Sequence, residues 1–573
     1  MLNHLKKSVL CAFAVSCGFA ALAQSSDVPR GWHLMDKTKD GYYGISMDKA
    51  YDLVKGKKSQ TVVVAVIDSG IDTLHEDLKA ILWTNPKEIP GNGIDDDNNG
   101  YIDDVHGWNF LGGKDGRNVT EDSYELHRVY HKYKDKFSKV IDPSTLSKDD
   151  QDLYAMWKKA EKEILGGDQA TSVTELIFLK RTYEGAIKSD SLLQKAIGKE
   201  VYTGKELEAF TPTTEEAKKA KTGFMFFFTA NDIKDMSNKA FLEDFKEYLA
   251  GQEKKATAAT SAPKNYRGDI VKDNEDDIND RIYGNNNIMV DERSALHGTH
   301  VSGIIGALRK NGKGMDGVAD NVRIMAIRAV PDGDEHDKDI ALAIRYAVDN
   351  GAKVINMSFG KSYSPEKKWV DDAVKYAESK GVLLVHAAGN DAADVDTTAN
   401  FPTPVFKGST TRATNWITVG ASGDPKAGGM VAYFSNYGKN EVDVFAPGVK
   451  IYATVPGGNT YADLQGTSMA SPVVAGTAAF LMSYFPNLTA QQVKYVIENS
   501  AITNIGDVKN PTTGNTVPFS ELSKTGGLLN AAEAVKLAEK ISGGKGGAPV
   551  STPKKDKKAK EAPKKVATPV KSF

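Results

Sequence analysis

The sequence has only two cysteines, and both lie near its start. Cys11 and Cys17 fall within an apolar stretch that follows two lysines and ends in Ala21-Leu22-Ala23. This pattern is typical of a secretory signal peptide with a small-residue cleavage site, so residues 1–23 are predicted to be one. The mature chain would then contain no thiol and no disulfide, although export would permit disulfides. A lipoprotein anchored through Cys17 is the alternative, but the residues before it match the lipidation pattern poorly.

The sequence also lacks a long apolar run and a strong net charge. A membrane-spanning helix needs about 20 apolar residues, and both the signal-like segment and the aromatic run at 224–228 are shorter. Lys and Arg number 73 against 75 Asp and Glu, which gives a formal net charge of −2. This balance gives no sign of a nucleic-acid partner. At 573 residues, the chain is expected to form one large core with additions.

Three separated segments carry side chains that suit acyl transfer. The run from Thr61 to Asp72 (TVVVAVIDSGID) reads as a buried strand that ends in Asp68. The segment LHGTHVSGIIG places His297 at the start of a helix of small residues. The segment QGTSMASPVVAG carries Ser468 into a helix N-terminus, where backbone N–H groups favour negative charge. Taken alone, Ser468 would be interpreted as a helix cap. Its interpretation as a nucleophile therefore depends on partner residues elsewhere in the chain.

The order Asp, His, Ser along the chain is the subtilisin order. Together the three segments resemble the subtilisin-like serine peptidases, over roughly residues 30 to 118 and 266 to 542. The resemblance implies that Ser468 is the nucleophile, His297 its general base, and Asp68 the group that orients the imidazole. His300 is the competing assignment for the base. In the family the first His of HGTH is catalytic and the second is structural, which favours His297.

The same resemblance assigns an oxyanion donor and a substrate edge. The segment GVLLVHAAGN ends in Asn390, whose side chain would stabilise the oxyanion together with the Ser468 N–H. An extended substrate would add by main-chain hydrogen bonds to an edge strand, which implies broad specificity. That edge would be Ser358, Phe359 and Gly360, with Phe359 where the family usually has Leu. The primary pocket would be lined by Ala387, Ala388 and Gly389, small residues that leave room for a large apolar side chain.

An acidic run from Asn92 to Asn109 (NGIDDDNNGYIDDVHGWN) follows the Asp68 segment. Its oxygen-bearing side chains alternate before Gly100 as in the first half of a calcium-binding EF-hand loop. The candidate ligands are Asp95, Asp97, Asn99, the Tyr101 carbonyl, Asp103 and Asp104. The twelfth position is His106 instead of a bidentate Glu, so Asp103 or Asp104 would have to compensate. A solvated acidic turn is the alternative, but the number of ligands favours a structural Ca²⁺.

The remaining pattern predicts an α/β chain, a three-layer subtilisin-like fold with a mostly parallel central sheet, plus an inserted helical subdomain. Strands at 322–330, 354–358 and 382–388 alternate with helices at 337–350 and 367–380. The peptidase domain would comprise residues 61–118 and 266–542, preceded by a docking segment at 24–60. Residues 543–573 would be a disordered Lys/Pro-rich tail.

Residues 119–265 are predicted to be the helical insertion. Apolar residues recur at three- and four-residue spacing over 126–140, 148–164, 173–186, 214–227 and 232–249. The tract 254–263 is expected to be a linker back to the core. Because the insertion interrupts the loop after the strand that ends in Asp68, it is expected to cap the active-site cleft.

The sequence therefore predicts an exported, periplasmic or extracellular serine endopeptidase with peptide or protein substrates. Two alternatives stay open: a catalytically silent relative that binds peptides, and an esterase that uses the same triad. A complete triad with an oxyanion Asn argues against the first alternative. The extended edge from Ser358 to Gly360 argues against the second.

Overall fold

The computed structural model describes residues 28–165, 173–230, 233–234, 236–257 and 261–543. The predicted signal peptide, Cys17 and all of the predicted tail after Gly543 lie outside the described residues. Within the described part of the chain, no helix is both long and apolar enough to cross a membrane.

A seven-stranded sheet forms the centre of the molecule, in the order β2-β3-β1-β4-β5-β6-β7. Every neighbouring pair in it is parallel. The strands are β1 (Val62–Asp68), β2 (Gly107–Asn109), β3 (Val322–Arg328), β4 (Val354–Met357), β5 (Leu383–Ala387), β6 (Trp416–Ser422) and β7 (Val444–Pro447). The predicted parallel α/β fold is confirmed, although β2, β6 and β7 were not among the predicted strands.

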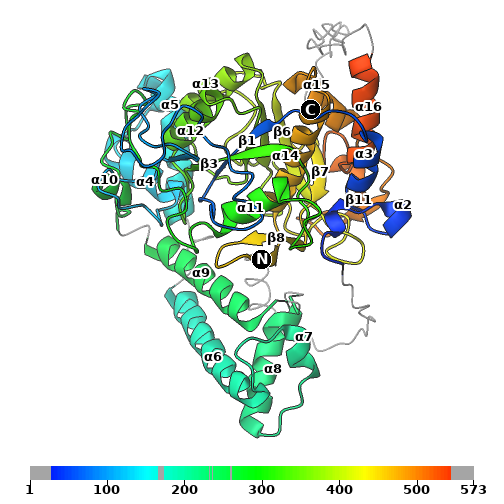
Figure 1. Ribbon diagram of the computed structural model, residues 1–573. Coiled ribbons are helices and arrows are strands. Elements are labelled where there is room, and N and C mark those ends of the chain that lie inside the picture. The colour runs from blue at the N-terminus through cyan, green and yellow to red at the C-terminus, as the bar shows by residue number, and fades with distance from the viewer. Residues whose placement is uncertain (1–27, 166–172, 231–232, 235, 258–260, 544–573) are drawn as a thin grey trace, which may run out of the picture.

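Helices cover both faces of this sheet. Successive side chains of a strand point to opposite faces, and those of the central strands are buried in two separate clusters, one on each face. Val64 and Val66 of β1 join one cluster, whereas Ala65 and Ile67 join the other. The first cluster includes α3 (Met47–Leu53), α11 (Leu296–Gly306), α14 (Thr467–Tyr484), α15 (Ala490–Asn499) and α16 (Ala531–Gly543). The second includes α12 (Asp337–Asp349) and α13 (Lys367–Ser379). The result is three layers, as predicted (Figure 1).

The remaining small elements lie around these layers. They are η2 (Trp32–Leu34), α2 (Lys37–Asp40), η4 (Phe519–Glu521) and two antiparallel hairpins, β8 (Ile451–Val455) with β9 (Thr460–Leu464) and β10 (Asp507–Lys509) with β11 (Thr516–Pro518). Trp32 is fully buried, and its Nε1 donates to the carbonyl of Val449 at 3.0 Å. The segment before β1 is thereby attached to the core.

The insertion is helical, as its periodicity predicts. It contains α4 (Glu125–Phe137), η3 (Pro143–Thr145), α5 (Lys148–Leu165), α6 (Val173–Ile197), α7 (Gly204–Ala209), α8 (Glu215–Ala230) and α9 (Asn238–Thr257), and α10 (Tyr266–Ile270) follows it. The predicted linker at 254–263 is wrong in its first part, because α9 continues to Thr257.

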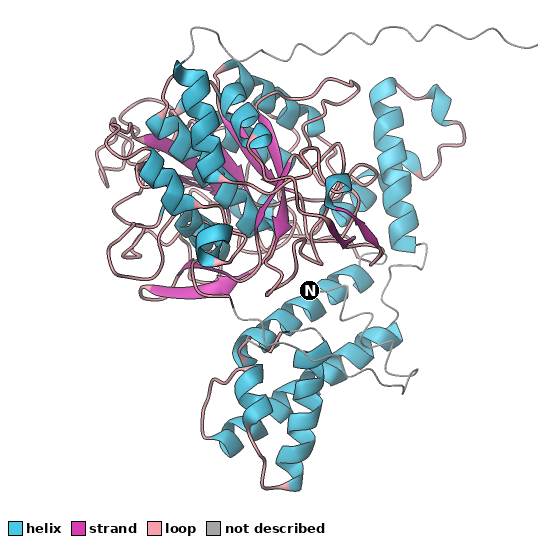
Figure 2. Cartoon of the chain, turned by 90° about the vertical axis from the view of Figure 1, so that its right-hand side faces the viewer, coloured by secondary structure: helices cyan, strands magenta, loops and turns pink. Residues whose placement is uncertain are grey.

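The helices of the insertion form two groups in space. Helices α4 and α5 lie against the body beside α12, whereas α6 to α9 form a lobe that projects from it (Figures 1 and 2). Residues 173–257 are called the lobe below. The loop that carries the insertion starts near the carboxyl ends of the parallel strands, the edge where α/β sheets place their sites.

Candidate active site

Asp68 and His297 form a hydrogen-bonded pair at the carboxyl end of β1. Asp68 is the last residue of β1, and its Oδ1 lies 2.7 Å from His297 Nδ1 on α11. The backbone N–H of Ser69 donates to the same oxygen at 2.7 Å. A side chain at Gly298 would collide with the Gly70 carbonyl, at 2.2 Å from the ideal Cβ position. The glycine after the histidine therefore permits this close approach of helix and turn.

The electrostatics of the pair suit a general base. Burial lowers the pKa of the His297 imidazole, but the charge of Asp68 and its hydrogen bond outweigh burial and hold the pKa above its ordinary value. With Nδ1 directed at Asp68, Nε2 is left for the proton of a nucleophile. Burial lowers the pKa of His300 to about 3 instead, and its Nε2 lies 3.1 Å from the Ala462 carbonyl. His300 is therefore a neutral ring held within the core.

Ser468 is the second residue of α14, so its backbone lies at the positive end of a long helix. Its Oγ donates to the Ser358 carbonyl at 3.0 Å, and Ser358 Oγ donates to the Ser468 carbonyl at 2.9 Å. Within the described residues, no hydrogen bond joins Ser468 Oγ to His297. The hydroxyl must therefore leave the Ser358 carbonyl before it can transfer a proton to the imidazole.

Asn390 faces the start of the same helix. Its Oδ1 accepts hydrogen bonds from the N–H of Thr467 at 2.8 Å and from Thr467 Oγ1 at 3.0 Å. Thr467 Oγ1 also accepts from the Gly389 N–H at 3.0 Å. Because the two hydrogen bonds from Thr467 go to the amide oxygen of Asn390, the NH₂ group of Asn390 is left as a donor beside Ser468. Thr467 was not predicted as part of the site, and its only sequence signal is its place next to Ser468.

A cavity of about 800 Å³ opens beside these groups and includes residues of the insertion. Asp68, His297, Ser358 and Phe359 line it from the core, and Thr120, Glu121, Tyr124 and Lys246 line it from the insertion. Lys246 belongs to α9 of the lobe, whereas Tyr124 directly precedes α4. Both halves of the insertion thus reach the space next to His297.

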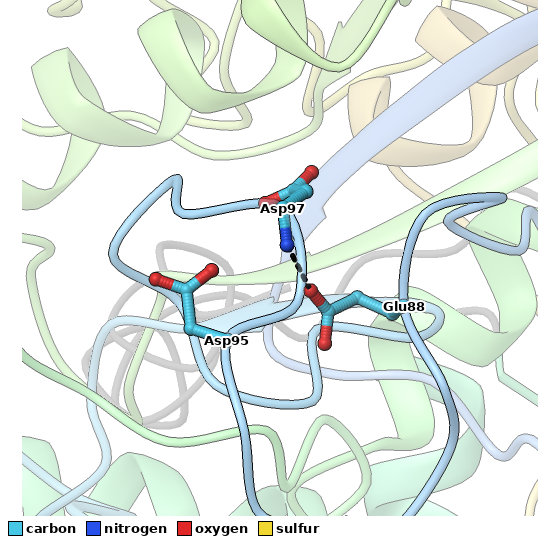
Figure 3. Close-up of side chains that lie close together, drawn as sticks. All are labelled: Glu88, Asp95 and Asp97. Carbon is cyan, nitrogen blue, oxygen red and sulfur yellow. Dashed lines mark hydrogen bonds between the residues drawn. The ribbon is translucent and has the colours of Figure 1, made fainter.

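The acidic run places two of its predicted ligands in a carboxylate cluster. Ligand atoms of Glu88, Asp95 and Asp97 lie within 4.8 Å of one another (Figure 3). Glu88 Oε1 accepts from the backbone N–H groups of Asp96 at 3.0 Å and Asp97 at 3.3 Å. Glu88 Oε2 is buried and has no hydrogen-bond partner in the described structure. Glu88 was not predicted, because it precedes the acidic run.

The other predicted carboxylates are directed elsewhere. Asp103 accepts from the backbone N–H groups of residues 91, 92 and 93. Asp104 accepts from the Tyr346 hydroxyl at 2.6 Å and from Asn85 Nδ2 at 2.8 Å, and burial raises its pKa to about 6. Asn99 Oδ1 accepts from the Tyr101 N–H at 2.7 Å. The structure therefore brings Asp95 and Asp97 together with Glu88, and not with Asp103 or Asp104.

Comparison with known proteins places the chain in a family. A family model described as the subtilase family matches residues 59–531. Subtilisin DY of Bacillus licheniformis is 41% identical over 214 residues, which cover 37% of this chain and 72% of that protein. Thermitase of Thermoactinomyces vulgaris is 36% identical over 236 residues, 40% of this chain and 77% of that protein. A thermophilic serine proteinase of Bacillus sp. strain AK1 is 43% identical over 206 residues, but the match spans only 46% of its length.

Proposed function

The chain belongs to the subtilase family and is by class a serine endopeptidase, and we propose that it cleaves polypeptides with Asp68, His297 and Ser468 as its catalytic triad. The observation that carries this assignment is the 2.7 Å bond between Asp68 and His297. Ser468 lies at the start of α14, beside the edge that begins at Ser358. The three residues come from different elements that meet at one end of the sheet.

The proposed reaction begins when a substrate adds to the edge at Ser358. A substrate N–H that donates to the Ser358 carbonyl replaces the Ser468 hydroxyl there, and the hydroxyl becomes available to His297. Nε2 takes its proton while Oγ forms a bond to the substrate carbonyl carbon. Asn390 Nδ2 and the Ser468 N–H stabilise the resulting oxyanion. The imidazolium then gives its proton to the leaving amine as the C–N bond breaks, and water hydrolyses the acyl-enzyme in the same way.

This mechanism fixes the sign of the pH dependence. Only neutral His297 can accept the proton of Ser468, and Asp68 holds the pKa of the imidazole above its ordinary value. The value of kcat/KM should therefore rise with pH through an apparent pKa above about 6.5. A pH profile measured with one short peptide tests this directly.

The first experiment is labelling with a fluorophosphonate serine probe, followed by mass spectrometry and a peptide assay. Wild type should be labelled at Ser468, and Ser468→Ala should lose both labelling and hydrolysis. Asn390→Ala should lower kcat by about 100- to 1,000-fold, as expected for one oxyanion donor. Ser483→Ala is the matched control, because Ser483 lies on the same helix and its hydroxyl has no partner in the described structure.

Two results would contradict the proposal. A folded chain that is neither labelled nor active on peptides would be a peptide-binding relative. A chain that hydrolyses esters but not peptides would be an esterase.

We also propose that Glu88, Asp95 and Asp97 hold a structural Ca²⁺. The supporting observation is Glu88 Oε2, a buried carboxylate oxygen without a hydrogen-bond partner on a residue that is only 7% exposed. Such hard oxygen donors suit Ca²⁺, and the ion would stabilise the loop without taking part in the reaction. At a free Ca²⁺ concentration of 100 Kd, it would add about 2.7 kcal/mol of stability.

Thermal unfolding in Ca²⁺ and in a chelator tests the ion. Wild type should melt at a higher temperature in Ca²⁺, and Glu88→Gln should abolish that difference. Asp96→Asn is the control, because the Asp96 carboxylate accepts from Ile89 and Asn92 of the same loop and is outside the cluster. A Tm of wild type that does not respond to Ca²⁺ would overturn the proposal.

Export is proposed from the sequence of residues 1–23. Expression of the full chain with its leader in a Gram-negative host should give a periplasmic or secreted product that begins after Ala23. An intact N-terminus in the cytoplasmic fraction would contradict export.

A further inference from the structure

One side chain, Asn400, lies against both walls of the proposed primary pocket. An ideal Cβ at Gly360 would lie 2.4 Å from Asn400 Oδ1. An ideal Cβ at Gly389, on the opposite wall, would lie 3.2 Å from Asn400 Nδ2. The carboxamide of Asn400 therefore contacts both of the segments that were predicted to leave room for a large substrate side chain.

Asn400 is held in this position by hydrogen bonds on both sides. Its Nδ2 donates to the carbonyls of Ala387 at 3.2 Å and Ala388 at 3.0 Å, which belong to the wall at β5. The next residue, Phe401, exchanges two backbone hydrogen bonds with Lys361, at 3.0 Å and 2.8 Å. Lys361 directly follows Gly360, so the backbone next to Asn400 is fixed to the other wall.

A small cavity adjoins Asn400. The cavity that Asn400 lines together with His386, Thr418 and Glu441 has a volume of only about 30 Å³, the share of one water molecule in the liquid. Within the described residues, Asn400 Oδ1 has no hydrogen-bond partner. The Asn400 Oδ1 beside Gly360 is thus left as a hydrogen-bond acceptor.

We propose that Asn400 is a specificity-determining residue and closes the primary pocket at a shallow depth. The enzyme then prefers Ala or Ser at the substrate residue before the cleaved bond, and the Ser hydroxyl donates to Oδ1. Large apolar side chains are excluded, because they would have to displace a carboxamide that makes two hydrogen bonds. This inference rests on the proposed endopeptidase function, and it replaces the sequence-based expectation of a pocket for large apolar residues.

The test uses a set of quenched fluorescent peptides that differ only at the residue before the cleaved bond: Ala, Ser, Leu and Phe. Wild type should cleave the Ala and Ser peptides at least tenfold more efficiently than the Leu and Phe peptides. Asn400→Gly should shift the Phe-to-Ala ratio of kcat/KM toward Phe by about 10- to 200-fold, the range for discrimination by side-chain size. Asn400→Ala should give a smaller shift in the same direction.

The matched control is Asn350→Gly. Asn350 follows α12 and precedes β4, so it lies at the opposite end of this strand from Ser358, and the ratio should stay unchanged. A wild type that prefers Phe or Leu would overturn the inference. The inference would also be overturned if Asn400→Gly is labelled by the fluorophosphonate to the same extent as wild type and still has the wild-type Phe-to-Ala ratio.

Labelling separates the two possible failures. If wild type is labelled at Ser468 and cleaves peptides without the expected preference, only the pocket inference fails. If wild type is neither labelled nor active, the endopeptidase function fails and the inference fails with it. If Asn400→Gly misfolds and is therefore not labelled, the Phe-to-Ala ratio of kcat/KM measured with Asn400→Ala tests the inference instead.

Discussion

The two halves of the insertion are attached to the molecule in different ways. Helices α4 and α5 bury Val129, Phe137 and Trp157 in one cluster with Tyr363, a residue of the peptidase core. The lobe buries a cluster whose members all lie between residues 176 and 249, with Phe224 and Phe228 fully buried at its centre. The first half completes its core with the enzyme, whereas the lobe completes its core by itself.

Buried charges strengthen this contrast. Lys361 Nζ lies 2.8 Å from Glu125 Oε2 of α4 and 2.9 Å from Asp337 Oδ1 of α12, and it donates to the Glu335 carbonyl at 2.7 Å. Buried charges are stable only while all of them are paired. Since Lys361 directly follows Gly360, this network connects α4 to the segment proposed as the substrate edge. None of these four residues belongs to the lobe, although Lys246 of the lobe lines the cavity beside His297.

The largest effect is expected at Lys361. Lys361→Met leaves buried Asp337 without its cation and leaves Glu125 with Arg128 as its remaining partner, at 2.7 Å. The loss should lower the free energy of unfolding by about 3 to 5 kcal/mol. Urea unfolding of the full chain measures it. Lys368→Met is the control, because Lys368 forms an exposed pair with Asp372 and its loss should have no measurable effect. Equal losses in both variants would show that α4 is not held by the buried network.

Replacement of a large side chain in the core of the lobe should lower stability by a comparable amount, but only within the lobe. Phe224→Ala should destabilise α6 to α9 locally by about 3 to 5 kcal/mol, while kcat/KM on short peptides stays at the wild-type value. Hydrogen exchange of α8 and α4 measures the two halves separately. Phe226→Ala serves as the control, since Phe226 lies on the same helix but is 47% exposed. Loss of protection in α4 would show that the halves form one unit.

A smaller change is expected at the start of α7. Thr203 Oγ1 accepts from the Glu206 N–H, and Glu206 accepts from the Thr203 N–H, a reciprocal cap. Thr203→Ala should cost about 1 kcal/mol within the lobe, read as faster hydrogen exchange in α7. Thr203→Ser should retain the cap, and any change in peptide hydrolysis would contradict the independence of the lobe.

The smallest expected effect is the pH dependence of the stability of the half of the insertion that contains α4. Burial raises the pKa of Glu275, but the hydrogen bond from His336 and the charges of His336, Arg267 and Lys132 together outweigh burial and bring the pKa to about 2. His336 also contacts Asp122, which lies three residues before the first residue of α4, at 3.1 Å. A depressed carboxyl pKa contributes stability that is present above about 4.5 and is lost as the pH falls toward 2. Glu275 is 39% exposed, so its share should stay below about 1 kcal/mol.

Hydrogen exchange of α4, corrected for intrinsic rates, measures this pH effect. Protection of α4 should fall between pH 4.5 and 2 more steeply in wild type than in Glu275→Gln. Identical profiles in the two proteins would contradict a role for the Glu275–His336 contact.

Long and regular patterns were predictable from the sequence. The β-branched run before Asp68 is β1, and the periodic segments at 337–350 and 367–380 are α12 and α13 within two residues of their ends. β6 and β7 were not predicted, because a short apolar run becomes a strand only when a neighbouring strand pairs with it. The end of α9 was misplaced because its last turn is rich in Lys, Ala and Thr, a composition shared by helices and linkers.

The sequence by itself determined the family, the order of Asp68, His297 and Ser468, and the local element that carries each of them. These features depend on patterns of neighbouring residues, which can be read directly from the sequence. Only the tertiary structure showed that the Asn400 side chain contacts both Gly360 and Gly389, that Glu88 joins the acidic cluster, and that Lys361 pairs with Glu125 of α4. Such contacts depend on the packing of distant segments, which also sets the direction in which each side chain points.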